Sequence, residues 1–166
     1  MNLKAAWGAF QDVEKLLGAG DVDQELVHLA HFDLGMFLWF LSLLPEFLGP
    51  AAKLLALVGF KGDSERGIAY LEEVAASSSL RAPFATVILV VRSLYLPMRA
   101  FPYVRSEDPN VVKGKELLAT MEQRWPTGFA GLLVRGIGLR KLGELDEAKA
   151  VFENLTQLLQ GQGIDP

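Results

Sequence analysis

A small residue recurs at the same place in three apolar segments of this chain. Gly67, Gly114 and Ala148 are each followed by large apolar residues four and seven positions later, which places each set on one face of a helix. Gly114 and Ala148 lie 34 residues apart, and Gly67 lies 47 residues before Gly114, which is the same period with 13 residues inserted. Small residues let two helices cross closely, so the period predicts a stack of antiparallel helical pairs.

The rest of the chain agrees with this pattern. Apolar residues recur every three or four positions nearly throughout, and glycine, proline and aspartate stand where helices should begin and end. Only VILVV, at 87–91, is typical of a strand, and its helical continuation through Leu94 without a partner strand favours a buried helix. The predicted helices span 3–18, 22–44, 47–60, 63–78, 82–98, 109–124, 127–142 and 145–161.

We therefore expect an all-α fold of about eight helices in one domain over 1–166. The helices should form antiparallel hairpins over about 3–44, 47–78, 82–124 and 127–161, stacked as a short right-handed superhelix. The third hairpin carries a proline-rich insert over 97–109. The last segment, LLVRGIGLRKLGELDEAKAVFENL, resembles the tetratricopeptide pattern, in which two antiparallel helices form each repeat.

Two glycines, Gly62 and Gly67, frame a charged GDSER segment that could be a phosphate-binding loop or a bend between helices. It does not follow a strand and lacks the Gly-Lys-Ser/Thr ending of a phosphate-binding loop. Asp63 is a good N-cap and Gly62 is suited to ending a helix. We interpret the segment as a helix boundary, with Gly67 at the helix crossing.

Three neighbouring segments, FLSLLP, LLALVGFKGDSERGIAYLEE and LRAPFATVILV, resemble the central block of the inclusion body clearance family, which includes the animal tetratricopeptide repeat proteins numbered thirty-nine. The resemblance covers about Gly35 to Leu94, and members of the family are several times longer. It implies an association with lipid-linked clearance of protein aggregates, lipid homeostasis and sterol metabolism. It supplies no catalytic residues to carry over.

Charge and composition exclude several classes of protein. The formal net charge is −4 and no run of basic residues occurs, which argues against nucleic-acid binding. The chain has no cysteine, which excludes disulfides and thiolate sites and fits a reducing, cytoplasmic location. It is 51% hydrophobic, with a mean hydropathy of +0.25, so it buries much surface or lies against an apolar partner.

The apolar runs do not predict a membrane-spanning helix. Eleven uncharged residues separate Asp33 from Pro45, against about 20 for a spanning helix. The run FATVILVVRSLYLP contains Arg92, which is costly in a bilayer. Buried core helices explain both runs, and a helix or hairpin on a membrane surface is the alternative.

Catalytic and metal sites are not predicted. Glu25, His28 and His31 share one helix face, but a metal site would need further ligands from elsewhere, and these are the only two histidines. The serines at 77–79 lack a sequence sign of a neighbouring base and are interpreted as a loop. We expect no enzyme, no cofactor and no metal.

Two surfaces are predicted to bind a partner, a concave face and the insert. The alternative for the concave face is that the helix Gln24 to Leu44 fills it, and the alternative for the insert is that its aromatic residues pack against the neighbouring helices as core. One is the apolar concave face formed by the first helix of each pair, and the other is the insert, whose arginines and aromatic residues are typical of binding hot spots. The groove residues are Ala52, Ala56, Phe60, Thr86, Val90, Leu94, Leu133, Ile137, Arg140 and Lys141, and those of the insert are Arg99, Phe101, Tyr103 and Arg105.

The sequence leaves three hypotheses. The favoured one is a non-catalytic adaptor or scaffold that binds a protein or peptide, such as an amphipathic helix. The alternative is a module that binds lipid or lies on a membrane surface. The third is a structural piece of a longer superhelix, whose uncapped ends would make it form a homodimer.

Overall fold

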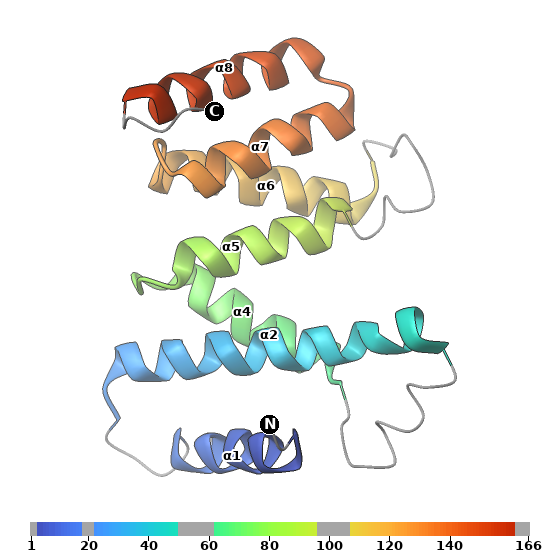
Figure 1. The fold of residues 1–166 in the computed structure, drawn as a ribbon, viewed down its shortest axis with the longest axis vertical. Coiled ribbons are helices and arrows are strands. Elements are labelled where there is room, and N and C mark those ends of the chain that lie inside the picture. Colours follow the sequence, from blue (N-terminus) through green and yellow to red (C-terminus); the bar gives the residue numbers. More distant parts are fainter. Residues whose placement is uncertain (1–2, 18–21, 50–61, 96–106, 162–166) are drawn as a thin grey trace. The chain divides into compact units, whose positions relative to one another are not determined.

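The computed structural model describes residues 3–17, 22–49, 62–95 and 107–161 (Figure 1). Within these ranges every regular element is a helix, which confirms the all-α prediction. In chain order they are α1 (Leu3–Leu17), α2 (Gln24–Leu48), α4 (Ser64–Ala76), α5 (Ala82–Val90), the π-helical turn η2 (Val91–Tyr95), α6 (Pro109–Arg124), α7 (Phe129–Leu142) and α8 (Leu145–Gly161).

Capping residues set most of the helix ends close to the predicted positions. Asp23, Asp63 and Asp108 precede α2, α4 and α6, and each side chain accepts a hydrogen bond from a backbone N–H of the first turn. Gly143 ends α7 in the left-handed region, with φ of 82°, where glycine has no steric penalty. Gly62 lies against α2, and a Cβ at this position would collide with the backbone of Leu41 and Ser42, so the close approach requires a glycine. Whether Gly62 also ends a helix stays a prediction, because the residues before it lie outside the described ranges.

Two helix boundaries differ from the prediction. α2 passes through Pro45 and ends at Leu48. Pro45 has no N–H to donate to the carbonyl four residues earlier, and the helix continues for only three residues after it. Gly49 has φ of 52° and donates its N–H to the Pro45 carbonyl, which ends the helix. Residues 47 and 48 therefore belong to α2, Gly49 is its C-cap, and residues 50–60 of the predicted helix 47–60 lie outside the described residues.

The second difference is in the predicted helix 82–98. It is α-helical only to Val90 and continues as the wider turn η2 to Tyr95, while 96–98 lie outside the described residues. Ser93 and Leu94 of this turn are buried. The VILVV run is therefore helical, as its spacing indicated.

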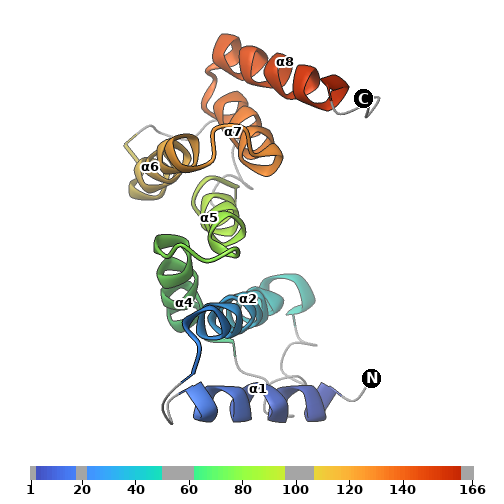
Figure 2. The ribbon, with the colours of Figure 1, turned by 90° about the vertical axis from the view of Figure 1, so that its left-hand side faces the viewer.

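Contacts between Cα atoms divide the chain into two compact units, 1–85 and 86–166, and each is described by itself. In the first unit α2 packs against α4, and Figure 2 shows the two helices crossing. A Cβ on Gly67 would lie 2.8 Å from the Gly35 carbonyl oxygen and 2.8 Å from the Trp39 nitrogen, so the predicted crossing position is confirmed. The buried side chains of this unit include Leu34, Leu38, Trp39, Ile68, Leu71 and Val74.

The second unit has two apolar clusters. The first joins the end of α5 and η2 to α6 and α7, and a Cβ on Gly114 would lie 2.5 Å from the Leu94 side chain. The second joins α7 to α8 around Ala148, with Gly136 against the Phe152 ring. The three small residues of the sequence period are thus buried among helix contacts. The hairpin limits, the single domain over 1–166 and the right-handed superhelix stay predictions.

Candidate functional site

The predicted binding residues fall into three groups. Phe60 of the groove lies outside the described residues, with Ala52 and Ala56, and so do the insert residues Arg99, Phe101, Tyr103 and Arg105. Two groove residues, Val90 and Leu94, are described but have no exposed surface. The remaining four are partly or fully accessible on α7: Leu133, Ile137, Arg140 and Lys141.

The burial of Val90 and Leu94 corrects their assignment to the partner surface. Both side chains have 0% exposure and pack in the apolar cluster with Val111, and Thr86 is 1% exposed. Their helix is apolar on every side, so α6 and α7 cover the face that the repeat register assigned to a partner. These residues stabilise the second unit and are not available to a ligand.

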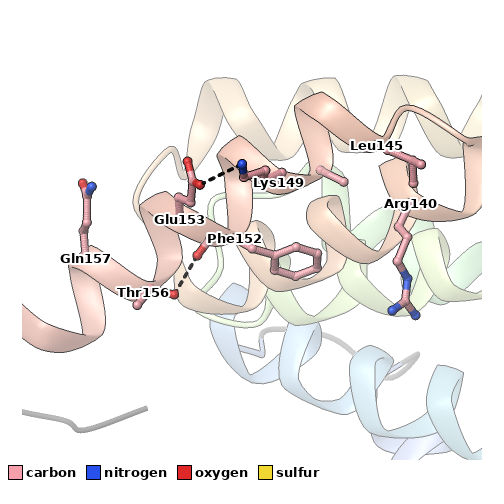
Figure 3. Close-up of a pocket in the computed structure, with 8 residues that line it drawn as sticks. Arg140, Leu145, Lys149, Phe152, Glu153, Thr156 and Gln157 are labelled. Carbon is pink, nitrogen blue, oxygen red and sulfur yellow. Dashed lines mark hydrogen bonds and ion pairs between the residues drawn. The ribbon is translucent and has the colours of Figure 1, made fainter.

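A groove of about 560 Å³ runs along α8 and reaches Arg140 of α7 (Figure 3). Its lining follows a helical spacing along α8, so one face of that helix forms most of the groove. Leu145, 64% exposed, and Phe152 supply its apolar surface. The other lining residues are Ala148, Lys149, Glu153, Thr156 and Gln157.

The electrostatics of this groove are dominated by Arg140. Lys149 Nζ lies 3.8 Å from Glu153 Oε1, so these two charges offset each other. Thr156 Oγ1 donates to the Phe152 carbonyl at 2.9 Å. The Arg140 guanidinium makes no hydrogen bond or ion pair with another described residue, and it lies at the end of the groove. The lining of the groove thus combines an apolar surface with one positive charge at its end.

Tyr95 lies near Arg140 in the same unit. Its hydroxyl donates to the Val134 carbonyl at 3.3 Å. Burial raises the pKa of Tyr95 to about 12, and the positive charge of Arg140 acts in the opposite direction. Tyr95 is therefore a neutral hydrogen-bond donor at physiological pH.

Sequence reasoning missed the α8 face. It placed Phe152, four residues after Ala148, only on the helix face of the repeat pattern. The available signal was the width of the apolar stripe. Val151 and Leu155 face the core with Ala148, while Leu145 lies beyond the area that α7 covers. When the apolar stripe of a helix is wider than the area that one neighbouring helix covers, the uncovered part indicates a second contact surface.

The polar residues considered for a metal site have separate partners. Glu25 accepts hydrogen bonds from Ser79 Oγ at 2.9 Å and from the Leu80 N–H at 3.2 Å. His28 Nε2 lies 3.2 Å from the Gln24 amide. His31 Nδ1 lies 3.0 Å from Glu73 Oε2, in a geometry that does not make a directed hydrogen bond. The contacts of Glu25 and His31 join α2 to α4 and the loop after it, whereas the His28 contact lies within α2. No group of three potential metal ligands occurs among the described residues.

A second polar cluster joins α1 to α4. Arg66 forms an ion pair with Glu14, and the Tyr70 hydroxyl donates to the same Glu14 oxygen at 3.1 Å. Burial raises the pKa of Tyr70, and the hydrogen bond that Arg66 donates to Tyr70 raises the pKa of Arg66. His31 stacks on the Tyr70 ring with 4.4 Å between centroids. These contacts connect α1 to α4, and through His31 they extend to α2.

α2 is notable for its length and apolarity. Its segment Gln24–Pro45 is long and apolar enough to cross a membrane by length and composition, and 22% of that window is buried. The sequence estimate counted only the charge-free run after Asp33 and was shorter. The opposite faces of α2 differ, since one packs on α4 and the other carries exposed Leu26 and Phe40. A helix that serves as one side of a helical pair in a folded unit passes the same test of length and composition.

Comparison with known proteins places these features in a family. Residues 10–161 match the family model described as Iml2/Tetratricopeptide repeat protein 39. The chain is also similar to Tetratricopeptide repeat protein ttc-39B of Caenorhabditis elegans, with 24% identity over 161 residues that cover 92% of this chain and 27% of that protein. The chain thus spans about a quarter of the length of this curated relative. No solved structure gives a significant match.

The match extends beyond the central block on which the sequence resemblance rested, and it confirms that resemblance. It also agrees with the helical pairs and with the small residues at their crossings. Because the family model covers most of its length, this chain belongs to the Iml2/tetratricopeptide repeat protein 39 family.

Proposed function

We propose that this protein is a non-catalytic adaptor that holds a protein partner in the α8 groove. Helical-repeat folds of this kind generally present surfaces to protein partners. The observation that carries the proposal is the groove itself, in which Leu145 is 64% exposed beside an arginine without an ion-pair partner among the described residues. An exposed leucine beside Phe152 has apolar area to gain by burial, which gives a partner a favourable contact.

The fitting partner is an amphipathic helix with an acidic residue. Its apolar side chains would cover Leu145 and Phe152, and its carboxylate would lie near Arg140. An arginine can bind a carboxylate through two parallel hydrogen bonds, which fixes the orientation of the partner. Leu133, Ile137 and Lys141 lie on the same helix as Arg140 and extend the proposed surface along α7. We also propose that the insert over 97–109 contacts the partner, because its arginines and aromatic residues are typical of binding hot spots.

Site-specific photocrosslinking tests this assignment. A photoreactive amino acid replaces Leu145 in one variant and Val112 of α6 in a control variant, since both are exposed apolar residues of the second unit. The partner crosslinked from position 145 is then purified and its affinity measured. Leu145→Glu and Arg140→Glu should each weaken binding by about 1–3 kcal/mol, the usual cost at a hot spot, and Val112→Glu should leave it unchanged. Equal crosslinking from both positions would reject the α8 groove.

A second candidate is supported by α2. The exposed apolar residues of this long helix favour a module that binds lipid or lies on a membrane surface, in line with the lipid-linked role that the family resemblance implies. Flotation with neutral liposomes separates the candidates, because an adaptor stays at the bottom of the gradient. We propose a cytoplasmic location for the adaptor and a peripheral membrane location under the second candidate. Light scattering at several concentrations tests the proposed homodimer.

A further inference from the structure

The face of α2 turned away from α4 carries a second apolar stripe. Its members follow a helical spacing over about four turns, or roughly 21 Å at 1.5 Å per residue. Gly35, Leu38 and Trp39 lie on the opposite face, against Gly67 of α4. The residues of the stripe are Leu26, Leu29, Ala30, Asp33, Phe37 and Phe40.

Helix α1 covers this stripe only in part. Phe10 stacks on Phe37 with 4.7 Å between ring centroids, and hollows of about 270 and 340 Å³ lie along the stripe. Phe10 and Asp33 line both hollows. Leu26 and Phe40, near the two ends of the stripe, are 56% and 55% exposed. The structure thus leaves apolar surface open on both sides of a central carboxylate.

Asp33 has no ion pair or hydrogen bond within the described residues. The charged side chains nearest to Phe10 on α1 are already paired, Glu14 with Arg66 and Lys15 with Asp12. Arg81 lies over the Phe32 ring at 5.4 Å and is not bonded to Asp33. Among the described residues, the stripe therefore presents one negative charge, near its centre, that no positive charge offsets.

This charge decides what can cover the stripe. An acyl chain or a purely apolar helix would remove water from the carboxylate without replacing its interactions, which is costly. A second copy packed about a two-fold axis would bring its own Asp33 opposite the first, because the residue lies midway between Leu26 and Phe40. A lysine or arginine on the covering segment would instead form a charge-assisted hydrogen bond with Asp33.

We propose that this stripe, with the two hollows beside Phe10, binds an amphipathic helix of a partner protein whose apolar face carries one basic residue opposite Asp33. The apolar side chains of that helix enter the two hollows, and its length is about four turns. The site is distinct from the α8 groove, where the available charge is positive, and it does not depend on the adaptor assignment of that groove.

Two designed peptides of about 18 residues test the proposal with the full chain. Both form a leucine-rich amphipathic helix and differ only at the centre of the apolar face, which holds lysine in one and glutamate in the other. Binding is measured by fluorescence anisotropy. The lysine peptide should bind about tenfold more tightly, and Asp33→Lys should reverse the order of the two peptides. Asp33→Asn should lower the affinity for the lysine peptide by about threefold, as expected for a partly exposed ion pair.

Matched variants separate binding from folding. Glu65→Lys makes the same change of charge at an exposed position of α4 and should leave the order of the peptides unchanged. Phe40→Ala should lower the affinity for both peptides, because it removes an exposed apolar side chain that both would contact. Circular dichroism confirms that each variant keeps its helices. The proposal is overturned if both peptides bind equally, if Asp33→Lys has no effect, or if Phe40→Ala instead abolishes liposome flotation or a concentration-dependent dimer.

Discussion

Gly67 offers the most direct test of how the first unit is held together. Alanine at this position would place its Cβ 2.8 Å from the Gly35 carbonyl oxygen and 2.8 Å from the Trp39 nitrogen. Both atoms belong to the backbone of α2, so neither can move aside by a change of side-chain rotamer. Ordinary contact begins at 3.4 Å, and the two helices would have to separate by about 0.6 Å along this direction.

Two opposing effects set the size of the change. Replacing glycine by alanine inside a helix normally stabilises it by about 1 kcal/mol. Inserting a methyl group into a well-packed contact costs about 1–3 kcal/mol. Because the neighbouring atoms of Gly67 are backbone atoms, we expect the upper part of this range and a net loss of about 1–2 kcal/mol in the free energy of unfolding.

Urea unfolding followed by circular dichroism and tryptophan fluorescence measures this loss, and replacing Trp7 and Trp125 by phenylalanine in every variant leaves Trp39 as the reporter of the α2–α4 contact. Gly8→Ala is the matched control, since a Cβ there has no neighbour within 4 Å and should bring a gain of up to about 1 kcal/mol. Adding Gly35→Ala to Gly67→Ala should cost less than the sum of the single changes, because the helices are already apart. Unchanged or increased stability of Gly67→Ala would refute the close crossing.

Three further predictions concern stability. Leu71→Ala should cost about 2–5 kcal/mol in urea unfolding, because the leucine is fully buried. Asp63→Ala should lower the free energy of unfolding by about 1 kcal/mol, because the 3.0 Å hydrogen bond from the Arg66 N–H is lost. Asp63→Asn should keep most of this stability, because asparagine also caps helices. Burial raises the pKa of Tyr95 above its value in the unfolded chain. The contribution of Tyr95 to the free energy of unfolding is therefore complete below pH 10 and is lost as the pH rises toward 12. Tyr95→Phe should remove that pH dependence, and an unchanged profile would contradict it.

The helix boundaries were predictable where a single residue decides them. An aspartate before an apolar run caps a helix whatever the tertiary surroundings, and α6, which follows Asp108, has the limits that the sequence predicts. Pro45 misled the prediction because a proline removes one backbone hydrogen bond but does not by itself fix the residue at which a helix ends. The end of α2 is set by Gly49, which has a positive φ. Nothing in the sequence distinguishes Gly49 from the other glycines among the 16 of the chain.

The partners of helix faces were harder to predict than the helices. The period of small residues identified Gly67 as a crossing position, but it could not identify Gly35 as the residue opposite, because that pairing depends on the tertiary placement of α2. The repeat register likewise placed Val90 and Leu94 on an open surface. In the structure other helices cover them, since a helix that is apolar on all sides is stable only when it is enclosed.

The same reasoning explains why the chain is so apolar. α2 and α8 each use one stripe for a close crossing and carry further apolar residues outside it, so part of the hydrophobic composition serves surfaces in addition to cores. The two surfaces differ in charge, because Asp33 lies at the centre of one and Arg140 at the end of the other. A covering helix that suits Asp33 would place its basic residue against Arg140 in the α8 groove, where like charges repel. The two sites should therefore select different partners, and exchanging the charges at 33 and 140 should exchange those preferences.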